Sequence, residues 1–140
     1  MPEAWERDAF AVLAELAART TRIHLATGIV NVFSRSPALL AMSAAMLDEI
    51  SGGRFRLGLG TSGARVIEDF HGVKFNNPLT RLRETVQIIR LLVAGERADF
   101  EGRSFNLERF KLGFTPVRAH TLDPRNVETG GKSAARLAGT

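Results

Sequence analysis

A short apolar segment that runs directly into a glycine-rich turn constrains the fold of this chain most. Residues 55–63 read Phe-Arg-Leu-Gly-Leu-Gly-Thr-Ser-Gly, so Gly58, Gly60 and Gly63 follow the spacing of the dinucleotide-binding fingerprint. Glycine lets backbone N–H groups come close to a phosphate and adopts positive φ without strain. The turn therefore predicts either a phosphate-binding loop or a purely structural connection between a strand and a helix.

A nicotinamide-binding Rossmann domain would satisfy only part of this pattern. That fold places an acidic residue about 20 positions after the glycines, at the end of a second strand. Glu84 stands near that distance, but it lies within a helical pattern, and no second buried strand follows Gly63. The sequence therefore argues against a Rossmann domain.

Hydrophobic periodicity predicts alternating helices and strands along the chain. We expect helices over 3–18, 37–50 and 78–95, strands over 22–30, 54–60 and 111–117, and a small hairpin over 100–105. Ser36 is a suitable N-cap before Pro37, and Gly52 a suitable stop. Strands separated by helices favour an α/β fold with a parallel sheet covered by helices.

The first two predicted strands have one bulky face and one face of small residues. Ala26 and Gly28 in the first strand, and Gly58 and Gly60 in the second, lie towards the carboxyl ends. Parallel sheets bind ligands beyond those ends, and small residues there leave room for a flat ring next to the backbone. The alternative interpretation is that the glycines relieve crowding inside a narrow barrel.

Composition narrows the class of protein. The chain has 140 residues, 44% of them apolar, no cysteine and a net charge of +4. That size suits one globular domain with a core of its own. No apolar run approaches the roughly 18 residues of a membrane span, and no signal peptide opens the chain. We therefore expect a cytoplasmic protein that binds neither membranes nor nucleic acid. Its three histidines lack the spacing of metal ligands, so we expect no metal site.

Several segments in the same order resemble the luciferase-like monooxygenase family. They are residues 23–31 (Ile-His-Leu-Ala-Thr-Gly-Ile-Val-Asn), 36–41, 47–63, 78–84, 100–102 and 110–116. The likeness covers about residues 8 to 118. It is strongest to the branch that uses the deazaflavin coenzyme F420, the methylenetetrahydromethanopterin reductase-like proteins.

The resemblance implies a (β/α)8 TIM barrel with the cofactor ring in the mouth at the carboxyl ends of the strands. The resemblance implies three groups of cofactor-binding residues. At Gly28, Ile29 and Val30 the family often has a non-prolyl cis peptide behind the ring, and Asn31 and Ser34 line the mouth. The third group, near the phosphate-bearing tail, is Gly60, Thr61, Ser62 and Gly63. The implied cofactor is coenzyme F420, with FMN as the alternative. The implied chemistry is hydride transfer to or from a small organic substrate, or its monooxygenation with FMN. No catalytic residue is assigned.

Two departures from the family predict a truncated barrel. A complete barrel takes about 250 residues and eight strands, whereas this chain would begin just before the second helix and supply about three parallel strands. Residues 119–131 are polar and turn-like where another apolar strand is expected. We therefore predict a partial barrel domain over 1–118 and a divergent or poorly ordered tail over 119–140. The alternative function is a non-catalytic α/β fragment that self-associates through open sheet edges at 23–30 and 111–117.

A few side chains that suggest a site are better explained as structural. Met42 and Met46, four residues apart, are expected to pack in a helix core. Arg81 and Glu84 fit a surface pair spaced i, i+3 on a helix. His24 lies near the amino end of its strand, away from the expected mouth.

Overall fold

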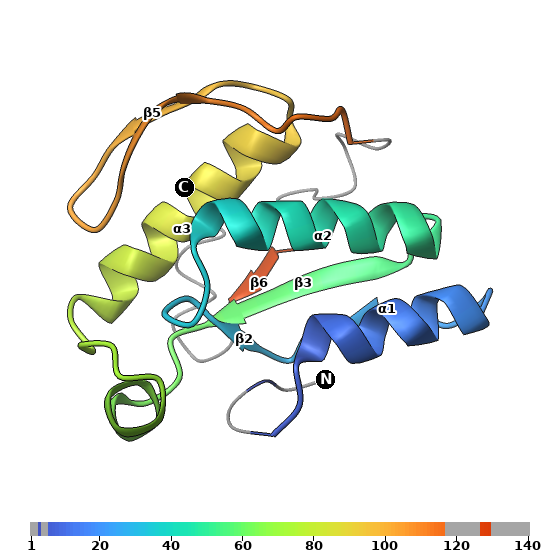
Figure 1. The fold of residues 1–140 in the computed structure, drawn as a ribbon, viewed down its shortest axis with the longest axis horizontal. Helices are drawn as coiled ribbons and strands as arrows, with labels where there is room; N and C mark the ends of the chain where they lie inside the picture. The colour runs from blue at the N-terminus through green and yellow to red at the C-terminus, as the bar shows by residue number, and fades with distance from the viewer. Residues whose placement is uncertain (1–2, 4–5, 117–126, 130–140) are drawn as a thin grey trace.

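The computed structural model describes residue 3, residues 6–116 and residues 127–129. Its helices and strands are α1 (Ala9–Arg19), β1 (Leu25–Ala26), β2 (Val30–Asn31), α2 (Pro37–Ser51), β3 (Phe55–Gly60), the π-helical turn η1 (Val66–Phe70), α3 (Pro78–Val93), β4 (Ala98–Glu101), β5 (Asn106–Phe110) and β6 (Val127–Thr129). Figure 1 shows β3 running beside α1 and α2, with the β4–β5 hairpin arching over α3.

Strand β3 is the centre of a parallel sheet. β1 pairs with its beginning through Leu25 and Phe55, and β2 pairs with its end through Val30 and Leu59. β6 also pairs with β3 in parallel, and its partners include Leu59. Because Leu59 has partners in both β2 and β6, these two strands flank β3 on opposite sides.

Two strand predictions need correction. The strand predicted over 22–30 is divided into β1 and β2, since the chain leaves β3 between them. Residues 111–116 form no strand, because Gly113 and Pro116 interrupt the segment; residue 117 lies outside the described residues. The third parallel strand is instead β6, within a stretch predicted to be turn-like. Its three residues are too short a run to stand out in a polar sequence.

The helices cover the bulky face of β3. α1 packs against β1 and α2, α2 also packs against β3, and α3 packs against α2 (Figure 1). The largest fully buried side chains in this core include Leu40, Leu57, Leu59, Ile88 and Ile89. No helix in the described part of the chain is long and apolar enough to cross a membrane.

Local capping signals explain where the helices begin and end. Ser36 caps α2 by accepting a hydrogen bond from Leu39 N at 3.1 Å, and Gly52 ends it in the left-handed conformation at φ 63°. α1 begins at Ala9 rather than at residue 3, because the Asp8 side chain caps it. Glu3 precedes the helix, and its carboxylate accepts a hydrogen bond from Ala9 N at 2.9 Å.

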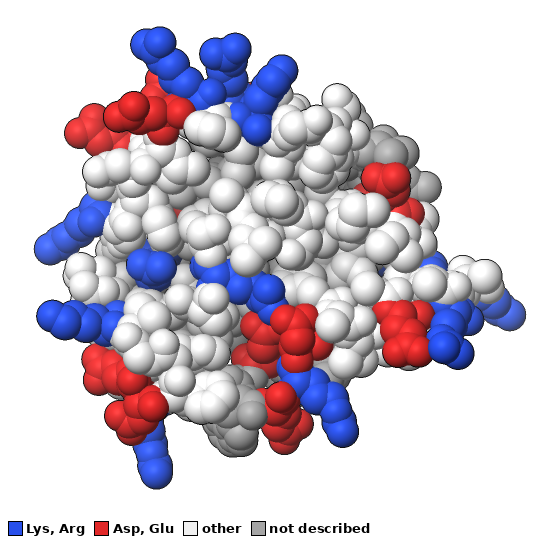
Figure 2. All heavy atoms as spheres, viewed as in Figure 1, with Lys and Arg blue, Asp and Glu red and all other residues white. Residues whose placement is uncertain are grey.

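The outer face of α2 is apolar and exposed, contrary to the prediction for its methionines. Met42 and Met46 are 49% and 47% exposed, and Leu39 and Ile50 on the same helix are also exposed. Figure 2 shows the charged side chains mostly around the rim of this view, with an area free of them at its centre, where Figure 1 places α2. Because α2 carries apolar residues on both its buried and its exposed face, its sequence has no periodicity that identifies the buried face.

Arg81 and Glu84 are not a surface pair either. The Glu84 carboxylate is buried and accepts hydrogen bonds from Arg103 N and Ser104 N, each at 2.8 Å, so it holds the hairpin turn against α3. Arg81 Nε donates to Val32 O at 2.9 Å, and its guanidinium lies over the rings of Phe33 and Phe105. Burial lowers the pKa of Arg81, and the charge of Glu84 opposes that shift.

Candidate functional site

The predicted mouth lies where β2 and β3 end. Beyond β2, Val32 N still donates to Gly60 O at 3.0 Å, so the two strands stay together up to the glycine turn. Thr27 N still donates to Arg56 O at 3.3 Å, and the chain bulges away from β3 at Gly28 and Ile29. The peptide bond between these two residues is cis, as the resemblance predicts. The bulge and the turn therefore stand next to each other at the carboxyl edge of the sheet.

The Thr27 hydroxyl joins the bulge to β3. It donates to Gly58 O at 2.8 Å and accepts from Gly58 N at 2.8 Å, so one side chain satisfies both backbone groups of Gly58. Thr27 is not among the site residues predicted from the sequence. A single threonine before a glycine carries no signal for a partner 31 positions away.

The glycines of this region differ in the space that surrounds them. A Cβ on Gly58 would lie 2.2 Å from Thr27 O, and one on Gly60 would lie 2.9 Å from the Ile29 side chain. A Cβ on Gly28 or on Gly63 would meet nothing within 4 Å. Gly58 is thus required by packing against backbone, Gly60 is in tight contact with the movable Ile29 side chain, and Gly28 and Gly63 border open space.

Asn31 shapes the loop that follows β2. It is fully buried, and its Oδ1 accepts hydrogen bonds from Phe33 N at 3.0 Å and Ser34 N at 2.7 Å. Its Nδ2 is buried and has no hydrogen-bond partner among the described residues. The Ser34 hydroxyl, half-buried, donates back to Asn31 O at 3.4 Å. The loop therefore presents one unused donor at the end of the strand.

The loop after β3 is more open. Thr61 and Ser62 are half-buried and Gly63 is exposed. The Thr61 hydroxyl donates to Ser62 O at 3.2 Å, and Ser62 adopts a left-handed conformation with φ 57°. These hydroxyls and backbone groups lie on the accessible side of the turn and carry no charge.

The structure brings the predicted site residues together in two neighbouring segments. They are Gly28, Ile29, Val30, Asn31 and Ser34 around β2, and Gly60, Thr61, Ser62 and Gly63 at the end of β3. The Val30 side chain belongs to the core with Leu59, so only its backbone can take part in a site. Among the described residues, no group of three or more His, Asp or Glu side chains is arranged to hold a metal.

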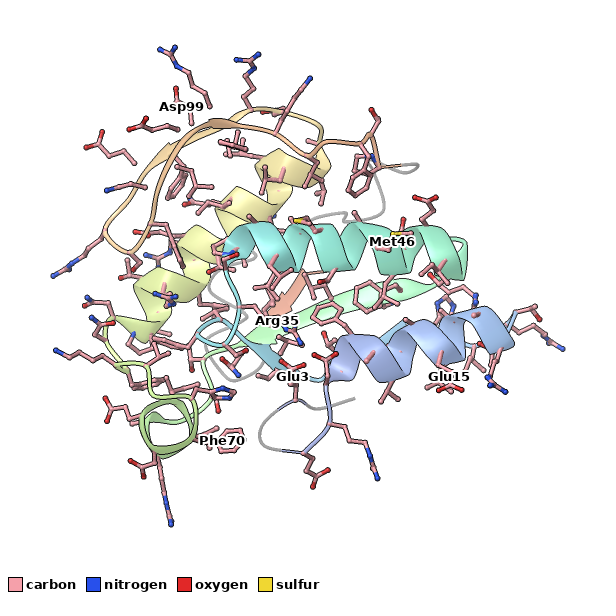
Figure 3. All side chains as sticks on the ribbon, in the orientation of Figure 1. Glu3, Glu15, Arg35, Met46, Phe70 and Asp99 are labelled. Carbon is pink, nitrogen blue, oxygen red and sulfur yellow. The ribbon has the colours of Figure 1, made fainter. Side chains whose placement is uncertain are left out.

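An ionic cluster closes the outer side of the loop after β2. Arg35 forms ion pairs with Glu3 at 3.1 Å and with Asp8, and Figure 3 shows Arg35 next to Glu3. Burial raises the pKa of Asp8, but the hydrogen bond from Ala11 N and the Arg35 guanidinium outweigh burial and hold that pKa below its ordinary value. A hollow of about 320 Å³ borders this cluster and is lined by Glu3, Glu6, Arg7, Asp8, Ser34, Arg35, Phe70 and His71.

Comparisons with known proteins agree with this architecture. The chain is 40% identical over 110 residues to 5,10-methylenetetrahydromethanopterin reductase of Archaeoglobus fulgidus, a match that covers 79% of this chain and 33% of that protein. Monooxygenase RslO1 from Streptomyces bottropensis superposes with a TM-score of 0.72 at 33% identity, covering 81% of this chain and 35% of that one. The coenzyme F420-dependent tetrahydromethanopterin reductase from Methanopyrus kandleri has the same fold, with a TM-score of 0.77 at 24% identity over 91% of this chain and 40% of that one.

These relatives identify the sheet and its helices as part of a TIM barrel. The chain spans about a third of the length of the curated relatives it matches. The sequence model of the family described as luciferase-like monooxygenase matches residues 1–140, the whole chain. The chain belongs to the luciferase-like monooxygenase family.

Proposed function

We propose that this chain forms part of the cofactor site of an oxidoreductase that uses coenzyme F420, with FMN as the alternative. The activity we propose for the whole protein is hydride transfer or monooxygenation on a small organic substrate. The proposal is supported by the family match and by relatives whose names include F420-dependent enzymes. When bound, such a ring supplies the redox chemistry, and the protein supplies binding, orientation and electrostatics.

The observation that carries the proposal is the open, uncharged surface at the ends of β2 and β3. Gly28 borders open space, and three residues further along the chain Asn31 Nδ2 is a buried donor without a partner among the described residues. A planar ring bearing hydrogen-bond acceptors fits both features, because it needs a flat surface and one or more donors. We propose that Gly28 and Ile29 lie behind the ring, with Asn31 and Ser34 at its edge. Thr61, Ser62 and Gly63 would face the anionic tail.

The proposal predicts that filling the space at Gly28 abolishes cofactor binding without unfolding the chain. Gly28→Leu places a side chain where the ring would lie, and nothing within 4 Å of the Cβ position opposes it. We expect at least a tenfold loss of affinity for F420 or FMN, measured by fluorescence titration. Gly113→Leu is the matched control, since Gly113 also borders open space but follows the hairpin. Equal affinity in Gly28→Leu and the parent chain would contradict the site.

The residue bounds of the domain and its cellular compartment are also proposals. We propose that a partial barrel domain spans 1–118, with β6 adding a strand from the segment that follows. The rest of 119–140 lies outside the described residues. The absence of cysteine fits a reducing compartment, which supports a cytoplasmic location.

The apolar face of α2 supports the second candidate, in which copies of the chain associate. Leu39, Met42, Met46 and Ile50 form a stripe on one helix that presents the same surface in every copy, as a two-fold interface requires. This face replaces the sheet edge predicted at 111–117, where no strand is described. In this second candidate the chain is a non-catalytic α/β fragment that self-associates.

Association through α2 predicts a change of mass when the stripe is charged. The double variant Met42→Glu and Met46→Glu should run as a 15.3 kDa monomer in size-exclusion chromatography with light scattering, and the parent chain at about twice that mass. The control is Phe110→Glu, which charges an exposed aromatic residue on the hairpin instead. If the parent chain is already a monomer at high concentration, α2 is not an interface between copies.

A further inference from the structure

Three buried side-chain atoms among the described residues lack a hydrogen-bond partner: Asn31 Nδ2, Asp48 Oδ1 and Thr85 Oγ1. Asp48 and Thr85 lie within helices, and only Asn31 lies at the carboxyl end of a strand. Asn31 is 0% exposed, and its Nδ2 has no hydrogen-bond partner in the part of the chain that the structure describes. Buried polar atoms are nearly always hydrogen-bonded, because a donor removed from water and left unpaired costs free energy. We interpret an unpaired, buried donor at the carboxyl end of a strand as an indication of ligand binding.

The identity of this atom as a donor is fixed by its neighbour. Asn31 Oδ1 accepts two hydrogen bonds, from Phe33 N and Ser34 N. Turning the amide over would place its NH2 group against both N–H donors and lose both bonds, so the assignment of oxygen and nitrogen is determined. Asn31 Oδ1 therefore stabilises the loop, and Nδ2 is the atom that remains unpaired.

Asn31 shares one face of the sheet with Gly60. Val30 and Leu59 are register partners in the core, and successive residues of a strand point to opposite faces. Asn31 and Gly60, the next register pair, therefore belong to the other face of the sheet. The Ile29 side chain lies next to Gly60 and provides an apolar neighbour.

The surroundings favour a neutral acceptor over a phosphate. Residues 28–34, the segment that carries Asn31, contain no charged side chain. A buried anion needs a cationic partner or several donors, whereas a carbonyl oxygen is satisfied by one or two neutral donors. The ligand atom that meets Asn31 is thus best described as the carbonyl oxygen of a planar ring.

We infer that Asn31 Nδ2 donates a hydrogen bond to a ring carbonyl of the cofactor, so that Asn31 both shapes the mouth loop and sets the orientation of the ring. This inference rests on the proposed function. Deazaflavins and flavins both carry carbonyl groups on one edge of the ring. Asn31 therefore recognises that shared edge and does not discriminate F420 from FMN, while the Thr61–Gly63 loop takes the phosphate-bearing end.

The substitution Asn31→Asp tests the donor alone. It retains an oxygen to accept from Phe33 N and Ser34 N, but replaces the NH2 group with an acceptor that repels a carbonyl. We expect F420, FMN and riboflavin, which lacks the phosphate, each to bind at least tenfold more weakly to Asn31→Asp than to the parent chain. Asn106→Asp, the same change on the hairpin, should leave all three affinities unchanged. Circular dichroism checks that both variants fold.

A second measurement on the parent chain keeps the inference testable if Asn31→Asp does not fold. In a 15N-labelled chain, riboflavin should shift the side-chain amide resonances of Asn31, and inorganic phosphate should not. Unchanged affinity in a folded Asn31→Asp variant, or a side-chain amide that ignores riboflavin bound by the parent chain, would overturn the inference and leave the proposed function standing. A parent chain that binds none of the three ring compounds would overturn both.

Discussion

Gly58→Ala is expected to destabilise the fold by about 3 kcal/mol or more, because the added methyl group meets backbone rather than a movable side chain. Its Cβ would lie 2.2 Å from Thr27 O, so the bulge and β3 must move apart. That movement also weakens both 2.8 Å hydrogen bonds between the Thr27 hydroxyl and Gly58. The measurement is the midpoint of urea unfolding, followed by circular dichroism.

Gly63→Ala provides the control for Gly58→Ala within the same glycine motif. Its Cβ would meet nothing within 4 Å, so we expect its unfolding midpoint to stay close to that of the parent chain. Equal midpoints for Gly58→Ala and Gly63→Ala would show that the contact between the bulge and β3 is not as close as described. A large loss for both would mean that the motif needs glycine for conformational freedom instead.

Arg54→Met should cost about 3 kcal/mol of unfolding free energy, since several backbone carbonyls lose a charged donor at once. Arg54 Nε donates to Ser51 O at 2.7 Å, at the end of α2. Its terminal nitrogens donate to Ala17 O at 2.9 Å and Thr20 O at 2.7 Å, at the end of α1, and to Ile23 O at 2.9 Å. One guanidinium thus joins the ends of two helices to the start of the sheet.

Two further variants isolate this role of Arg54. Arg54→Lys keeps the charge but reaches fewer of these carbonyls, so its midpoint should fall between those of the parent chain and Arg54→Met. Arg19→Met removes an exposed arginine that pairs only with Glu15 on the same helix, and it should cost less than about 0.5 kcal/mol. An Arg54→Met variant as stable as the parent chain would contradict the proposal that Arg54 joins the ends of α1 and α2 to the sheet.

The parts of the fold that sequence predicted well are those set by neighbouring residues. α2 begins and ends where expected, because Ser36, Pro37 and Gly52 act within one turn of the helix. The β3 strand and the glycine turn follow each other directly in sequence, so both were recognisable. The resemblance to the family then supplied the barrel and the cis peptide after Gly28, neither of which local pattern could give.

The parts that sequence missed depend on distant partners. The break between β1 and β2 is held by the bond of Thr27 to Gly58, and β6 is a strand only because β3 offers it an edge. Glu84 is buried because the hairpin turn brings two N–H groups to its carboxylate. None of these partners lies close enough in sequence to leave a periodic signal.

The site was predicted as a set of residues but not in its details. The nine predicted positions do meet at the ends of β2 and β3, because parallel strands share one carboxyl edge. The sequence does not reveal that Gly58 is required by packing against the Thr27 backbone, whereas Gly28 borders open space. The unused donor on Asn31 also becomes visible only once Phe33 N and Ser34 N are seen to occupy its oxygen.

The most direct test of the proposed site is amide chemical-shift mapping of the 15N-labelled chain during titration with coenzyme F420. The proposal predicts saturable shifts concentrated at residues 28–34 and 60–63, with the rest of the described chain changing little. FMN should shift the same residues if it is the cofactor instead. Shifts confined to the hairpin hollow lined by residues 99–101 and 106–109, or no shifts at saturating concentrations of either cofactor, would contradict the account.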